Sequence, residues 1–111
     1  MITFAIYSTP MIIYNVTLNV DHDVAESWLQ WMIDTHIPDV MNTGMFIDNN
    51  IFRLIGDEKS GGITYAVQYR CADMATYEKY RDEFAPALQA ETNKKFQGKF
   101  VAFRSLLEVV K

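Results

Sequence analysis

The sequence lacks most of the features that would identify a chemistry directly. Its one cysteine, Cys71, cannot form a disulfide within the chain, which fits a reducing compartment and leads us to expect a cytoplasmic protein. No stretch approaches the ~20 apolar residues of a membrane span. Lysine and arginine are scattered, and the formal net charge is -4. Because phosphates and anionic lipids attract clustered basic residues, we expect neither nucleic acid nor a membrane as a partner.

Motifs for metal binding and nucleophilic catalysis are also missing. The two histidines, His22 and His36, fit no H-E-x-x-H pattern, and a single cysteine cannot make a C-x-x-C pair. The sequence contains no glycine-rich loop that would cradle a phosphate and no Ser-His-Asp arrangement. It therefore predicts no metal and no cofactor.

What the sequence does contain is one ordinary domain. The chain has 111 residues and is 50% hydrophobic, which suits a single core without disulfides. We assign the domain to residues 11–111. Residues 1–10 are apolar, but they lack the basic segment and the cleavage site of a signal peptide, so we treat them as an extension, either an upstream start or a loose tail.

Side-chain alternation predicts four strands, over residues 11–20, 45–56, 62–71 and 100–110. Helical spacing predicts a helix after the first strand and another after the third. The resulting order, β-α-β-β-α-β, is that of a ferredoxin-like fold of the α+β class. Right-handed crossovers would place both helices on one face of a four-stranded antiparallel sheet.

Aspartate and proline residues mark the expected limits of the helices. Asp23 should cap the first helix, with Glu26 completing a capping box, and Asp73 should cap the second. Pro38 and Pro86 should each kink or split the helix that contains them. Glycines suited to a left-handed helix end follow at Gly44 and Gly98.

The face of the sheet opposite the helices is expected to be bare. On the first and third strands it carries a mixed set of residues: Ile13, Asn15, Thr17, Asn19, Thr64, Ala66, Gln68 and Arg70. The last strand is apolar on both faces, with Phe103 and Leu107 on one and Phe100 and Leu106 on the other. A strand that is apolar on both sides expects cover on both sides, and a second subunit is the simplest cover. We therefore expect a homodimer.

Four segments carry a resemblance to a known group: IIYNVTLNVD (12–21), WLQWMIDTHIPDVMNTGMF (28–46), TYAVQYRC (64–71) and KFVAFRSLLEVV (99–110). Over Met11 to Lys111 the chain resembles the dimeric α+β barrel superfamily, in which two ferredoxin-like sheets pack face to face. Within it, the chain is similar to a family of short bacterial proteins known only as a domain of unknown function. The superfamily includes cofactor-free monooxygenases, haem-using enzymes, lactone isomerases and ligand-sensing modules, so the resemblance leaves the function open.

His36 is the candidate for chemistry. It lines up at helical spacing with Ala25 and Met32, on the stripe that should face the sheet. A histidine there can act as a general base or as a haem or metal ligand, and it can equally be a packing residue. Asp39 would orient the imidazole if one helical turn joins the two. Pro38 interrupts that turn, so Asp39 can instead cap the segment that follows.

A polar set on the bare face is the candidate for ligand binding. It consists of Asn15, Thr17, Gln68 and Arg70, which Arg53 or Arg104 could join. In a closed dimer of two sheets these side chains would line an interior cavity. Because buried polar groups must be paired, a small polar ligand would fit there, and a water-filled interface would meet the same requirement.

Two functions of different class remain open. The first is a non-catalytic dimer that binds a small molecule between its sheets. The second is a small cofactor-free or haem-dependent monooxygenase or isomerase, with His36 as base or ligand. The first needs only the fold, whereas the second also needs an access path to His36, so the sequence favours the first.

Overall fold

The computed structural model describes residues 10–56 and 60–111. The extension expected at residues 1–10, apart from Pro10, and part of the loop between the second and third strands lie outside the described residues. The elements are β1 (Ile12–Asp21), α1 (Ala25–Trp31), a π-helical turn η2 (Met32–His36), α2 (Ile37–Met41), β2 (Asp48–Arg53), β3 (Gly62–Cys71), α3 (Met74–Glu83), α4 (Ala85–Lys95) and β4 (Phe100–Glu108).

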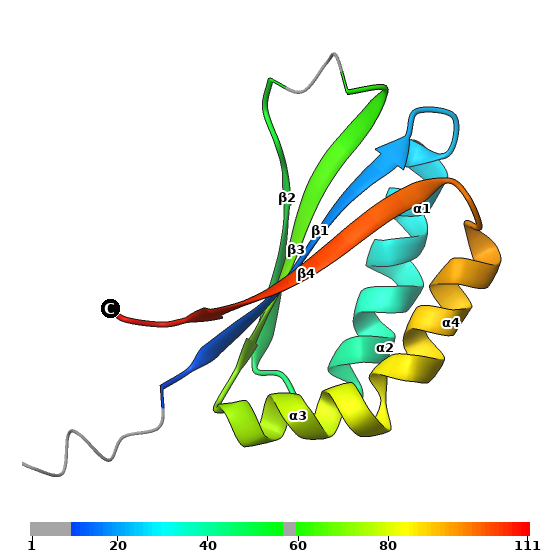
Figure 1. The fold of residues 1–111 in the computed structure, drawn as a ribbon. Helices are drawn as coiled ribbons and strands as arrows, with labels where there is room; N and C mark the ends of the chain where they lie inside the picture. Colours follow the sequence, from blue (N-terminus) through cyan, green and yellow to red (C-terminus); the bar gives the residue numbers. More distant parts are fainter. Residues whose placement is uncertain (1–9, 57–59) are drawn as a thin grey trace, which may run out of the picture.

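The four strands form one sheet in the order β2-β3-β1-β4. Each of its three neighbouring pairs is antiparallel. Figure 1 shows the helices gathered on one side of this sheet, with the other face open. The expected ferredoxin-like α+β fold is confirmed, although β2 is shorter than the alternation of its sequence predicts.

The hydrophobic core lies between the sheet and the helices. Alternate residues of the two central strands supply its floor: Ile12, Tyr14, Val16, Leu18, Val20, Tyr65, Val67, Tyr69 and Cys71, all buried. Aromatic rings pack across it, with centroids 6.0 Å apart for Tyr14 and Tyr69 and 4.7 Å apart for Phe46 and Tyr80. Period-two alternation in β1 and β3 therefore decides which face is buried.

Of the two aspartates expected to cap helices, only one does so. The carboxylate of Asp73 accepts the backbone N–H of Thr76 at 2.8 Å, as predicted for the start of α3. The capping box expected at Asp23 is wrong, because α1 begins after Val24 and has no side-chain cap. Asp23 instead accepts a hydrogen bond from Nζ of Lys99 at 2.8 Å, which ties this loop to the residue before β4.

The prolines act differently from one another. Pro86 splits its helical region as expected, since α3 ends at Glu83 and α4 begins at Ala85. At Pro38 the helical region restarts as expected, since α2 begins at Ile37, but the φ of -60° and ψ of -46° of Ile37 are those of an α-helix, so helical geometry is not broken there. The chain passes through the π-helical turn instead, and the N–H of Ile37 reaches the carbonyl of Met32, five residues back.

The π-helical turn shifts the buried stripe of this helical region by one residue. The buried positions along it are Ala25, Trp28, Met32, Ile37 and Val40. The step of five between Met32 and Ile37 leaves His36 half-buried beside the stripe rather than in its centre. Gly44 follows α2 with a φ of +78°, the left-handed conformation expected there.

Candidate functional site

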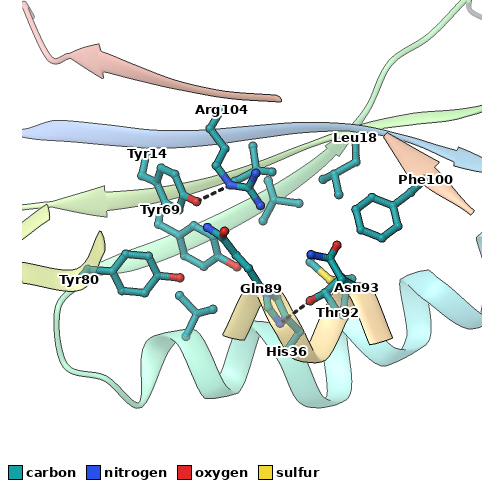
Figure 2. A pocket seen from close by; sticks show the side chains of 14 residues that line it. Tyr14, Leu18, His36, Tyr69, Tyr80, Gln89, Thr92, Asn93, Phe100 and Arg104 are labelled. Carbon is teal, nitrogen blue, oxygen red and sulfur yellow. Dashed lines mark hydrogen bonds between the residues drawn. The ribbon is translucent and has the colours of Figure 1, made fainter. Parts of the chain in front are cut away.

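A cavity lies between the helices and the sheet, beside β4 (Figure 2). Its enclosed part has a volume of about 40 Å³, and the groove that continues it along α4 and β4 has a volume of about 310 Å³. Six apolar side chains and the rings of three tyrosines form most of the cavity wall. The polar side chains that line it, apart from two further tyrosines, are His36, Tyr69, Gln89, Thr92, Asn93 and Arg104. The groove along α4 and β4 shares Gln89, Asn93 and Arg104 with the cavity, so the cavity opens there.

His36 is held by two neighbours on different elements. Its Nδ1 lies 3.3 Å from Oγ1 of Thr92 in α4, and its ring stacks on Trp31 with centroids 5.2 Å apart. Burial lowers the pKa of His36 from its ordinary value; Asp39 opposes this and Arg104 adds to it. His36 is therefore a neutral imidazole near pH 7.

The hydrogen bonds of Thr92 bear on the tautomer of His36. A hydroxyl has one proton to donate, and Oγ1 of Thr92 lies 3.3 Å from both the carbonyl of Leu88 and Nδ1 of His36. When Thr92 donates to Leu88, its contact with His36 requires the imidazole proton on Nδ1. That tautomer leaves the lone pair of Nε2 as an acceptor on the neutral ring.

Tyr69 carries a polar atom without a partner. Its side chain is 2% exposed, and its hydroxyl has no hydrogen bond to any described residue. The indole N–H of Trp28 is likewise unpaired, but Trp28 does not line the cavity. Burial raises the pKa of Tyr69 far above its ordinary value, and Tyr80 and Tyr14 raise it further, so the hydroxyl stays protonated and can donate. Leaving such a group unpaired costs about 1–3 kcal/mol.

Arg104 enters the cavity from β4, where its backbone is opposite Val16. Its Nε donates to the hydroxyl of Tyr14 at 3.0 Å (Figure 2). No carboxylate of residues 10–56 or 60–111 forms an ion pair with it.

The expectation that Arg104 or Arg53 would join the polar set on the bare face is wrong. Arg104 lies on the helix side, and so does Arg53, whose guanidinium is 5.8 Å from the ring centroid of buried Tyr65.

Part of the polar set predicted on the bare face is joined by hydrogen bonds. Nδ2 of Asn15 donates to Thr17 at 3.0 Å and to Ser105 at 3.3 Å, and Nε2 of Gln68 donates to Oδ1 of Asn15 at 3.1 Å. Arg70 is held apart by Asp48, at 3.3 Å. These groups already satisfy one another within one protomer, and their role in ligand binding stays a prediction.

The predicted pair of His36 and Asp39 is not joined by a hydrogen bond or an ion pair among the described residues. Asp39 lies in the first turn of α2, and Thr92 takes the place next to the imidazole. No sequence signal links His36 to Thr92, which lies 56 residues away along the chain. The catalytic roles of His36 and Asp39 stay predictions.

Two other features that would indicate a function are absent from the described part of the chain. No group of three or more His, Cys, Asp or Glu side chains there could hold a metal ion. No helix there is long and apolar enough to cross a membrane. The cavity with its uneven set of polar groups is therefore the candidate site.

A family described as a domain of unknown function (DUF4286) matches residues 11–110. No curated protein matches the sequence significantly.

Solved structures are similar in fold. A dimeric ferredoxin-like protein from an uncultured marine organism has a TM-score of 0.64 and 17% identity, covering 92% of this chain and 97% of that one. SnoaB, a cofactor-independent oxygenase from Streptomyces nogalater, has a TM-score of 0.66 and 9% identity, covering 93% of this chain and 96% of that one. A hydroxynitrile lyase from Passiflora edulis has a TM-score of 0.57 and 14% identity, covering 92% of this chain and 98% of that one. At these identities the likeness shows the fold alone.

The lowered pKa of His36 predicts a pH dependence of stability. As the pH falls below the ordinary value of 6.5, the unfolded chain gains a proton before the folded chain does. The free energy of unfolding should therefore decrease as the pH falls from 6.5 towards the pKa of folded His36. Urea unfolding at a series of pH values should show this decrease in the wild type and lose it in His36→Gln. His22→Gln, at an exposed loop position, should keep it. Parallel curves for the wild type and His36→Gln would contradict the assignment.

Proposed function

We propose that this chain, which belongs to the DUF4286 family of unknown function, is a homodimeric protein that binds a small molecule in the cavity between its sheet and its helices. The observation that carries the proposal is the hydroxyl of Tyr69, buried at the cavity wall without a partner. A buried donor is normally paired. An unpaired donor beside an open cavity therefore supports a bound molecule that supplies the acceptor. Because the oxygen itself is buried, a ligand atom can supply that acceptor when the side chains of the cavity wall shift to admit it.

The shape of the cavity supports the same proposal. Ligand sites are mostly apolar hollows with a few converging polar groups. Figure 2 shows Tyr69 and Arg104 reaching in from the sheet side, with His36 and Gln89 coming from the helices. The opening along α4 and β4 gives a small molecule a way in.

The open face of the sheet supports a homodimer. Large apolar side chains remain exposed on it: Val101 at 71%, Phe103 at 66%, Phe52 at 50% and Leu107 at 46%. Several such residues on one face mark an interaction surface. In a dimer the hydrogen-bonded set around Asn15 would lie inside the interface, which gives that set a structural role.

A reducing compartment, the cytoplasm, suits this protein. Cys71 is a fully buried thiol whose sulfur contacts the carbonyls of Met45 and Asp73. Burial raises the pKa of the Cys71 thiol, which favours the unreactive protonated form. Cell fractionation followed by detection of the protein would test the location.

A second candidate function is proton abstraction by His36. The specific observation in its favour is the neutral imidazole at the cavity wall, with Nδ1 engaged by Thr92. A lone pair on Nε2 could accept a proton from a bound substrate. This function needs the same cavity and the same ligand access as the first.

Replacing Tyr69 by phenylalanine should raise stability and weaken binding together. Removal of the unpaired hydroxyl should raise the free energy of unfolding by about 1 kcal/mol. Phenol, a small aromatic molecule whose oxygen can accept a hydrogen bond, should bind the wild type and shift NMR signals of His36, Thr92 and Phe100. Its affinity should fall about fivefold in Tyr69→Phe.

The matched control for that experiment is Tyr65→Phe. Tyr65 is also buried in β3, but it packs on Trp28 and does not line the cavity. This variant should bind phenol as the wild type does. If phenol shifted no signals around the cavity, or if Tyr69→Phe bound it unchanged and lost stability, the proposed ligand site would be wrong.

A charge on the open face should abolish the dimer. Phe103→Glu places a carboxylate among the exposed apolar residues of that face, where burial in an interface would be costly. Analytical ultracentrifugation should give a dimer for the wild type and a monomer for the variant. Ile33→Glu, in the helical layer at a residue 50% exposed, should stay dimeric. If the wild type were a monomer, the proposed interface on the open face would be wrong.

The second candidate requires a defined tautomer of His36. Long-range ¹H–¹⁵N NMR at neutral pH should show the proton on Nδ1 and none on Nε2. In Thr92→Val, which removes the acceptor of Nδ1, the proton should be free to redistribute to Nε2. A wild-type imidazole with its proton on Nε2 would leave no base facing the cavity.

A further inference from the structure

We infer that the ligand of this cavity is an organic anion with an apolar or aromatic body, whose carboxylate or similar group pairs with Arg104 at the mouth. The inference rests on the proposed function and names the class of molecule that the site would take. It comes from three features of the cavity: its charge, the depth of its polar groups and the chemistry of its remaining wall.

The charge around the cavity is opposite to that of the protein as a whole. The chain carries 14 acidic and 10 basic residues, yet no aspartate or glutamate lines the cavity or its groove. Arg104 is the one arginine or lysine among their described lining residues. A cation that lacks a carboxylate partner at such a site attracts an anion from solution.

The polar groups differ in depth. Arg104 is exposed and lines both the cavity and the outer groove, whereas buried Tyr69 lines the cavity alone. The hydrogen bond from Nε to Tyr14 fixes one edge of the guanidinium. Its two NH2 groups make no hydrogen bond with any described residue, so they can hold the two oxygens of a carboxylate.

The groups around Arg104 can add hydrogen bonds to an anion. Gln89 and Asn93 of α4 lie at the same mouth, and their neutral amides can donate to an anionic oxygen. Inside, Leu18, Met32 and Phe100 give an apolar wall that would be poor surroundings for a charge. The ligand should therefore be charged at one end and apolar beyond it, with an acceptor atom for Tyr69.

Two probes of the same shape, one charged and one neutral, separate the effect of the ligand's charge from that of its shape. Phenol carrying a carboxylate, 4-hydroxybenzoate, is compared with its neutral amide, 4-hydroxybenzamide, by NMR titration. The wild type should bind the carboxylate about tenfold more tightly than the amide. Added salt should reduce this difference, because the guanidinium at the mouth is exposed.

Arginine variants assign the effect to one side chain. In Arg104→Gln the two probes should bind equally, whereas Arg104→Lys should keep part of the preference for the carboxylate. Arg53→Gln is the matched control, since it removes the same charge from the helix side of the sheet but away from the cavity. It should leave the preference unchanged.

The outcomes separate the two proposals. Equal binding of the two probes to the wild type would overturn the anion inference and keep a cavity that binds small molecules. A preference that survives in Arg104→Gln would overturn the role of Arg104. If phenol and both probes failed to bind, the proposed function and the inference would fall together. Should Arg104→Gln not fold, Arg104→Lys and the salt dependence of the wild type decide the question.

Discussion

Alternation of side chains along β1 and β3 divides the sheet into a face packed against helices and a face left open, and the rest of the structure depends on that division. The helix-facing residues form the core and the floor of the cavity. Their neighbours in sequence, beginning with Asn15 beside Tyr14, form the polar set of the open face. A shift of register by one residue would exchange the two sets, so the sheet cannot slip without losing both surfaces.

The unpaired hydroxyl at the cavity wall lowers the free energy of unfolding. The helices could have closed over Tyr69 with an acceptor, as α4 does over His36 through Thr92. Instead the hydroxyl is buried and unpaired, while the π-helical turn sets His36 to one side of the buried stripe. Local departures of this kind, an unpaired donor on the sheet and a π-helical turn on the facing helices, are common where a fold serves a ligand rather than its own stability.

How much of this could be predicted depends on whether a feature is local. The strands, the cap at Asp73 and the split at Pro86 arise from neighbouring residues, and the sequence predicts them. Asp23 has the same local pattern as Asp73, but Lys99, distant in sequence, binds it instead. The side of the sheet on which Arg104 lies cannot be predicted from β4 alone, because this strand is apolar on both faces. Only its register, with Val16 opposite Arg104, decides which face meets the helices.

The same geometry keeps the two proposed surfaces apart. The cavity and the open face draw on alternate residues of the same strands, so they share a backbone but no side chain. A signal between them would have to pass through a sheet whose central strands pair along their whole length. Such a sheet deforms little, and coupling needs an element with two arrangements. The opening along α4 faces away from the proposed interface, so ligand exchange would not require the dimer to dissociate.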